Sequence, residues 1–159
     1  MDDPYDLGRF VAAQDAHRTY DAATAELRRG RKTSHWMWFV FPQIAGLGSS
    51  PTAQRYAISS LDEARAYLAH PVLGPRLAEC AGIVAATEGR TAEQIFGEID
   101  AMKLRSSATL FLRAAPEEPV FGHVLGRFFD GAPDPATDRL IGARHHMGAA
   151  TPRTSSSPS

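Results

Sequence analysis

The sequence is poor in cysteine, because Cys80 is the one thiol among 159 residues. A single cysteine excludes a disulfide framework within the chain and leaves too few thiolates for a cysteine-ligated zinc site. Cys80 lies among small and apolar residues, and we expect it to be a small buried side chain. Disulfide-stabilised folds and folds held by cysteine-bound zinc are therefore excluded.

The sequence also lacks an excess of charge and a long apolar run. Its 17 basic and 18 acidic side chains leave a formal net charge of -1, so no overall field attracts nucleic acid. No apolar run approaches a membrane span, and the acidic start at residues 1–4 is unlike a signal peptide. We therefore expect a cytoplasmic protein with no membrane partner, and we do not expect nucleic acid as a partner. The sequence indicates no cofactor and no metal, and it leaves the oligomeric state open.

Signals for helix starts and ends recur along the whole chain. Ser50, Ser60, Thr91 and Asp134 are suitable N-caps, each followed by apolar residues at helical intervals. No series of alternating strands accompanies them. The sequence predicts an all-α fold, a compact single domain over residues 7–142 with about seven or eight short to medium helices. Residues 143–159 are small and polar, and we expect them to form a disordered tail.

Three helix boundaries are specific predictions. The first helix is expected over residues 8–29, with His17 half-buried on its apolar stripe and Gly30 as its stop. The last helix is expected to start at Pro135 and to end at Gly142. Residues 34–41 suit a short helix or a strand, and we favour the helix because nothing nearby alternates well enough to pair with a strand.

The segment from Gly30 to Ser50, GRKTSHWMWFVFPQIAGLGSS, contains both tryptophans of the chain. Aromatic side chains this dense usually anchor a core, because each buries a large area. Cations precede them, and a glycine- and serine-rich loop follows and leads into a helix at Pro51. Backbone N–H groups of such a loop can bind an anion. The pattern is neither a Walker A motif nor a dinucleotide fingerprint, so it predicts a core anchor beside a ligand site of unspecified chemistry.

Each polar group in this region also has a structural interpretation. The basic residues 28–32 compensate the dipole of a helix C-terminus, and Ser34 can cap the next helix. Asp100, Lys103 and Ser106 share a predicted helix, where an ion pair and a hydrogen bond from the serine back to the helix explain them equally well. Both interpretations stay open at this point.

Several segments together resemble one bacterial family. They include residues 26–43 (ELRRGRKTSHWMWFVFPQ), 69–77 (AHPVLGPRL), 95–103 and 106–111. The sequence resembles domain-of-unknown-function family 1810 over roughly residues 7–142. The resemblance implies a small cytoplasmic α-helical protein without an established activity. The name calpastatin, which automatic annotation sometimes attaches to the family, implies a disordered protease inhibitor that this sequence does not resemble.

A fainter resemblance involves Pro51 to Tyr56, PTAQRY. This stretch is similar to the P-T-x-E-H-Y stretch of the NADAR families, small α-helical proteins associated with NAD and ADP-ribose chemistry, some of which cleave N-glycosidic bonds. Gln54 and Arg55 stand where that stretch has an acidic residue and a histidine. The resemblance implies a nucleobase or ribose held against the aromatic wall. The substitutions leave open a binder, or a different catalytic group such as Asp100.

The first hypothesis is a site for a nucleotide- or ADP-ribose-like ligand, with N-glycosidic hydrolysis as its candidate reaction. The catalytic candidates are Asp100, His35 and Lys103. The ligand-binding candidates are Arg31, Lys32, Ser34, Trp36, Trp38, Phe39, Gln43, Gly46, Gly48, Ser49 and Ser106. The alternative is a non-enzymatic protein-interaction module that uses the aromatic-basic surface and presents an exposed apolar patch.

Overall fold

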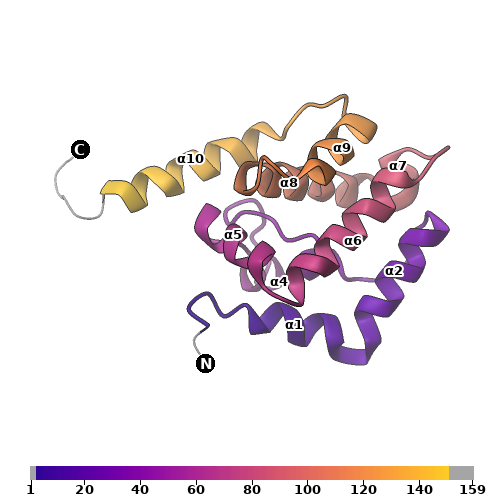
Figure 1. Cartoon of the computed structure of the whole chain (residues 1–159), viewed down its shortest axis with the longest axis horizontal. Coiled ribbons are helices and arrows are strands. Elements are labelled where there is room, and N and C mark those ends of the chain that lie inside the picture. Colours follow the sequence, from indigo (N-terminus) through magenta and orange to yellow (C-terminus); the bar gives the residue numbers. More distant parts are fainter. Residues whose placement is uncertain (1–2, 151–159) are drawn as a thin grey trace.

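The computed structural model describes the backbone of residues 3–150 and, within it, the side chains as far as Ala143. Figure 1 shows the chain as a succession of helices. They are α1 (Gly8–Asp15), the short 3-10 turn η1 (Ala16–Arg18), α2 (Thr19–Arg29), α3 (Met37–Val40), α4 (Pro51–Arg55), α5 (Leu61–Ala69), α6 (Leu73–Ala86), α7 (Ala92–Phe96), α8 (Glu98–Ala114), α9 (Pro119–Phe128) and α10 (Pro135–Ala150). The described residues contain no β-strand beyond one isolated bridge between Ile44 and Ile58. The all-α prediction is confirmed.

Helix α8 lies at the centre of the packing, where α5, α7, α9 and α10 all contact it (Figure 1). Its buried side chains include Ala101, Leu104, Ala108 and Phe111, which recur at three- and four-residue intervals. This spacing places an apolar stripe on one face of the helix. Because α10 also packs against α8, part of the α8 surface lies beside the C-terminal part of the chain.

The N-caps predicted at Ser50, Ser60, Thr91 and Asp134 form, whereas Ser34 does not cap α3 and instead donates its hydroxyl to Glu26. The side chains of Ser50, Ser60 and Thr91 accept hydrogen bonds from the backbone N–H groups three residues later. Asp134 likewise accepts from the N–H of Thr137 at the start of α10. These bonds satisfy N–H groups that have no partner within the helix. No helix among the described residues is both long enough and apolar enough to cross a membrane.

The aromatic segment forms the short helix α3, and Trp36 just before it anchors the core. Its side chain is 0% exposed. Its ring centroid lies 6.3 Å from that of Phe41 and 6.4 Å from that of Phe96. Its indole N–H donates to the Glu26 carboxylate at 2.9 Å. Burial of the ring together with a partner for its N–H is what a core tryptophan requires.

Two predicted boundaries are wrong. The helix expected over residues 8–29 is interrupted because His17 and Arg18 adopt left-handed conformations, with φ of 54° and 55°. His17, expected to be half-buried, is exposed at this break. The last helix runs through Gly142 to Ala150, because Gly142 is not among the positive-φ glycines and so does not end the helix. Residues 143–150 therefore belong to α10, and the rest of the predicted tail, 151–159, lies outside the described residues.

Candidate functional site

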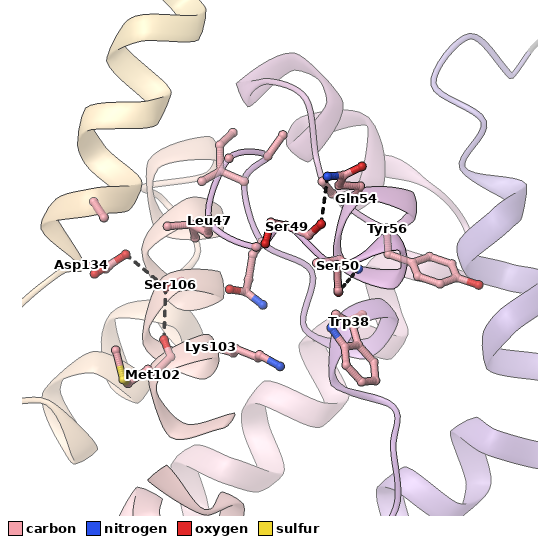
Figure 2. Close-up of a pocket in the computed structure, with 18 of the residues that line it drawn as sticks. Trp38, Leu47, Ser49, Ser50, Gln54, Tyr56, Met102, Lys103, Ser106 and Asp134 are labelled. Atoms are coloured by element: carbon pink, nitrogen blue, oxygen red, sulfur yellow. Dashed lines mark hydrogen bonds between the residues drawn. The ribbon is translucent and has the colours of Figure 1, made fainter. Parts of the chain in front are cut away.

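A pocket of about 750 Å³ lies between the loop at residues 43–50 with α4 on one side and α8 with the start of α10 on the other (Figure 2). Its size is in the range of pockets that hold small molecules. The side chains that carry its polar chemistry are Gln43, Ser49, Ser50, Gln54, Lys103, Arg105, Ser106 and Asp134, and Trp38 is its large aromatic residue. The pocket therefore combines an aromatic wall with groups of both charges.

Trp38 and Lys103 form one end of the pocket. The Lys103 ammonium lies 4.7 Å from the centroid of the Trp38 ring, and Figure 2 shows the lysine side chain extending toward the indole. An ammonium at this distance from an indole is attracted by the negative face of the ring. The contact holds a cation in the wall of the pocket.

Asp100 connects the Trp38–Lys103 pair to a second pair, Trp36 and Lys32. Its Oδ1 lies 3.4 Å from Lys103 Nζ and its Oδ2 lies 2.8 Å from Lys32 Nζ. The Lys32 side chain is only 7% exposed, and its ammonium lies 5.0 Å from the centroid of the Trp36 ring. Two ammonium groups share one carboxylate, so the cluster carries a net charge of +1. Neither Asp100 nor Lys32 lines the pocket.

Ser106 and Asp134 lie at the α10 side of the pocket. The Ser106 hydroxyl lies 3.1 Å from both the Met102 carbonyl and Asp134 Oδ2 (Figure 2). The same Oδ2 accepts from the N–H and the hydroxyl of Thr137, at 3.0 and 2.6 Å. The backbone N–H of Asp134 donates to the Thr109 hydroxyl on α8 at 2.9 Å. Asp134 therefore caps α10 and fastens it to α8.

Sequence reasoning missed Asp134 as a pocket residue, although it recognised the residue as a helix cap. The Asp-Pro pair signals a helix start, but Ser106 lies 28 residues earlier in the chain. No local pattern relates positions so far apart. Only the packing of α10 on α8 brings this carboxylate to the pocket.

The helix start that follows the loop at residues 46–50 has N–H groups that are already bonded. The Ser50 hydroxyl accepts from the Ala53 N–H, and the Ser50 carbonyl accepts from the Gln54 N–H. The start of α4 is therefore capped within the loop. Gly46 adopts φ of 106°, and a Cβ added there would lie 3.0 Å from the Leu140 side chain of α10. The glycine is needed for this close approach, which brings the loop against α10.

The two residues that depart from the NADAR stretch are also engaged. The Gln54 side-chain amide donates to the Ser49 carbonyl at 3.0 Å and lines the edge of the pocket (Figure 2). The Arg55 guanidinium lies over the Tyr56 ring, 5.5 Å from its centroid, and does not line the pocket. Gln54 thus supplies no carboxylate for a reaction.

Seven of the candidates lie together around the pocket: Trp38, Gln43, Gly46, Gly48, Ser49, Lys103 and Ser106. The others do not line it: Arg31, Lys32, Ser34, His35, Trp36, Phe39 and Asp100. Arg31 and His35 are exposed elsewhere, and Phe39 packs against Tyr56. Trp36 and Lys32 are used by the core. Of the three catalytic candidates, only Lys103 reaches the pocket.

Ser34 belongs to a network around Glu26, a buried carboxylate that sequence reasoning missed. Glu26 is 4% exposed and accepts hydrogen bonds from the backbone N–H groups of Thr33 and Ser34, the Ser34 hydroxyl and the Trp36 indole. Burial alone would raise the pKa of Glu26, but the hydrogen bonds from Ser34, Thr33 and Trp36 outweigh it and lower the pKa to about 2. The network fixes the turn that leads into α3.

These features define an all-α protein with a pocket of small-molecule size and, among the described residues, no group of three or more histidine, cysteine or acidic side chains suited to a metal ion. A family model with the description "Protein of unknown function (DUF1810)" matches residues 4–141. The chain belongs to this family, as the resemblance of residues 26–43 predicted.

A solved structure is similar over most of the chain. It is the crystal structure, at 1.38 Å, of the conserved hypothetical protein Rv1873 from Mycobacterium tuberculosis, with 54% sequence identity and a TM-score of 0.86. The match covers 88% of this chain and 99% of that one. Comparison with curated proteins finds no match. None of these findings supports the NADAR resemblance, which stays a hypothesis.

Proposed function

We propose that the pocket binds a nucleotide-like small molecule, with ADP-ribose and related compounds in the same class. One observation carries the proposal: a pocket of about 750 Å³ has an indole and an ammonium group side by side in its wall, at Trp38 and Lys103. An aromatic surface favours a planar group, and an ammonium favours an anion. Nucleotides combine both groups in one small molecule.

The charge around Lys103 supports an anionic ligand. Asp100 is shared between Lys103 and Lys32, so it does not neutralise both cations. Lys32 is nearly buried and its charge is screened little by solvent. A phosphate that reaches Lys103 gains a charge-assisted hydrogen bond beside this positive cluster.

We favour binding over N-glycosidic hydrolysis as the function of the pocket. Hydrolysis of this kind uses a carboxylate to activate water or to stabilise the oxocarbenium-like sugar. Asp100, the expected carboxylate, has both oxygens engaged with ammonium groups and does not line the pocket. Asp134 is a carboxylate that does line it, and its Oδ2 is used to cap α10. Incubation with NAD followed by chromatography tests the reaction directly, and release of nicotinamide above the rate of a Lys103→Met variant would establish an enzyme.

The binding test is a thermal-shift and tryptophan-fluorescence titration with AMP, ADP-ribose, NAD and adenosine. We expect the phosphorylated compounds to raise the melting temperature and to change the fluorescence. A ligand at a hundredfold its Kd adds about 2.7 kcal/mol of apparent stability. Trp38→Phe should remove the fluorescence change, because Trp36 is enclosed in the core.

Lys103→Met should weaken binding of the phosphorylated compounds at least tenfold, whereas adenosine, which has no phosphate, should be affected little. Arg29→Met is the matched control, because it removes an exposed cation that does not line the pocket. The proposal fails if none of the four compounds changes either the melting temperature or the fluorescence of the wild-type protein.

A second candidate function is protein interaction through the rim of the pocket. Ile99 and Met102 are 71% and 70% exposed on α8, and both border the pocket. Exposed apolar side chains at the mouth of a cavity are typical of an interaction surface. If this is their role, changing both residues to serine should abolish binding to a purified protein partner.

A further inference from the structure

We infer that Asp134 determines the specificity of the same pocket, by accepting hydrogen bonds from free hydroxyl groups on the ligand. The inference rests on the proposed function and extends it. The ligand then has an anionic group at the Lys103 end and an unsubstituted pair of sugar hydroxyls at the Asp134 end. A 5′-phosphorylated ribonucleoside has this arrangement.

The two oxygens of the Asp134 carboxylate are used differently. Oδ2 accepts all three side-chain hydrogen bonds that the described residues give this carboxylate, two from Thr137 and one shared with Ser106. Oδ1 accepts none of them, and Asp134 lines the pocket. An ionised carboxylate oxygen is a strong acceptor, so the free Oδ1 favours a ligand that brings a donor.

The surroundings of Asp134 favour a neutral donor over a cation. The Arg105 guanidinium also lines the pocket and donates to the carbonyls of Ala132 and Pro133, at 2.9 and 2.8 Å. These carbonyls belong to the two residues just before Asp134, so a fixed positive charge already lies near the start of α10. A ligand hydroxyl adds a hydrogen bond there without adding a second cation.

Ser106 completes a pair of acceptors. Its hydroxyl has a single proton, which is directed to the Met102 carbonyl or to Asp134 Oδ2. The lone pairs of its oxygen can therefore accept from a ligand. Two neighbouring acceptors suit two neighbouring hydroxyl groups, as in an unsubstituted ribose. A phosphate on either hydroxyl would instead be repelled by the carboxylate at close range.

The spacing of the two ends agrees with one small ligand. Lys103 and Ser106 are three residues apart on α8, which corresponds to about 5 Å along the helix. In Figure 2 the Lys103 side chain extends toward Trp38, while Ser106 and Asp134 face each other on the α10 side. The cationic end and the acceptor end are therefore separate parts of one pocket.

The test compares ligands that differ only at the ribose hydroxyls: AMP, 2′,3′-dideoxy-AMP and adenosine 2′,5′-bisphosphate, each titrated by calorimetry. Wild-type protein should bind AMP at least tenfold more tightly than either analogue. In Asp134→Asn this preference should shrink to about twofold, mainly because AMP binds less tightly and the bisphosphate is no longer repelled. Asparagine caps helices about as well as aspartate, so α10 should stay in place.

Asp138→Asn is the matched control, since Asp138 lies on α10 and pairs with Arg113 without lining the pocket. It should keep the wild-type preference. If the three ligands bind the wild-type protein equally, the inference is overturned while the proposed function stands. If none binds, the proposed function fails and the inference fails with it. Even if Asp134→Asn does not fold, equal binding of the three ligands by the wild-type protein overturns the inference.

Discussion

The two tryptophans of the chain, two residues apart, have similar partners and different environments. Trp36 lies against the Lys32 ammonium at 5.0 Å, and Trp38 lies against the Lys103 ammonium at 4.7 Å. Asp100 connects the two lysines. Trp36 is enclosed in the core, whereas Trp38 is half-buried and lines the pocket. The same pairing of a tryptophan with a lysine is therefore structural at Trp36 and available to a ligand at Trp38. The difference in burial of the two rings separates these roles.

One carboxylate of the core and one of the pocket differ in the same way. Both oxygens of Glu26 accept hydrogen bonds from groups that belong to the turn or to Trp36. Asp134 uses one oxygen for the start of α10, and no described residue donates to the other. A fully bonded buried carboxylate is therefore expected to affect stability, and a half-bonded one in a pocket is expected to affect binding.

The largest expected effect separates the two tryptophans. Trp36→Ala should lower the free energy of unfolding by about 3–5 kcal/mol, because it leaves a cavity in the core and removes the donor to Glu26. Trp38→Ala should cost only roughly 1–2 kcal/mol, because less of its surface is buried. Urea denaturation of both variants measures the difference. Equal losses of unfolding free energy would contradict the distinction between a core Trp36 and a pocket Trp38.

Glu26→Gln should have the next largest effect. The Glu26 pKa of about 2 lies below its ordinary value of 4.5, so the folded state favours the ionised form. The resulting stabilisation, roughly 3 kcal/mol, is present at neutral pH and is lost as pH falls from 4.5 through 2. The variant should therefore be less stable than the wild type at pH 7, and the gap should narrow in acid.

Denaturation at pH 7 and pH 3 measures this effect, since other acidic groups titrate equally in both proteins. Glu93→Gln is a suitable control, because Glu93 is exposed. A gap between wild type and Glu26→Gln that stays constant with pH would show that the Glu26 charge does not contribute.

The third expected effect on stability concerns Asp100, which links the Trp36–Lys32 pair in the core to the Trp38–Lys103 pair at the pocket. Asp100→Asn removes the carboxylate that pairs with the nearly buried Lys32 and should cost about 2 kcal/mol. Asp62→Asn breaks an exposed pair with Arg65 and should cost below about 1 kcal/mol. If thermal denaturation gives equal losses of stability for Asp100→Asn and Asp62→Asn, Asp100 does not couple the Lys32 pair to the Lys103 pair energetically.

Much of the fold could be predicted because its signals are local. Ser50, Ser60, Thr91 and Asp134 each cap a helix through a backbone group three residues away, so a short window of sequence contains both partners. One exception is the break at His17 and Arg18. Left-handed conformations are usually signalled by glycine, and neither residue is one.

The candidate site was predicted only in part. Trp38, Lys103, Ser106 and the loop at residues 46–49 lie together as expected. His35 and Arg31 were grouped with them because they are neighbours in sequence, but short helices and turns direct adjacent side chains to different sides. The ion pair between Asp100 and Lys103, one of the two interpretations left open, forms, and Lys32 is a second partner of Asp100.

Helix type, most caps and the presence of an aromatic core anchor follow from composition and short-range pattern, because hydrogen bonds within a helix and its caps join residues a few positions apart. The faces of Trp36 and Trp38, the burial of Glu26 and the place of Asp134 beside Ser106 come from packing between helices. Those contacts join residues 10 to 28 positions apart, so no short window of sequence contains both partners. The sequence thus specified an all-α protein with an aromatic anchor, and the packing of its helices created the pocket.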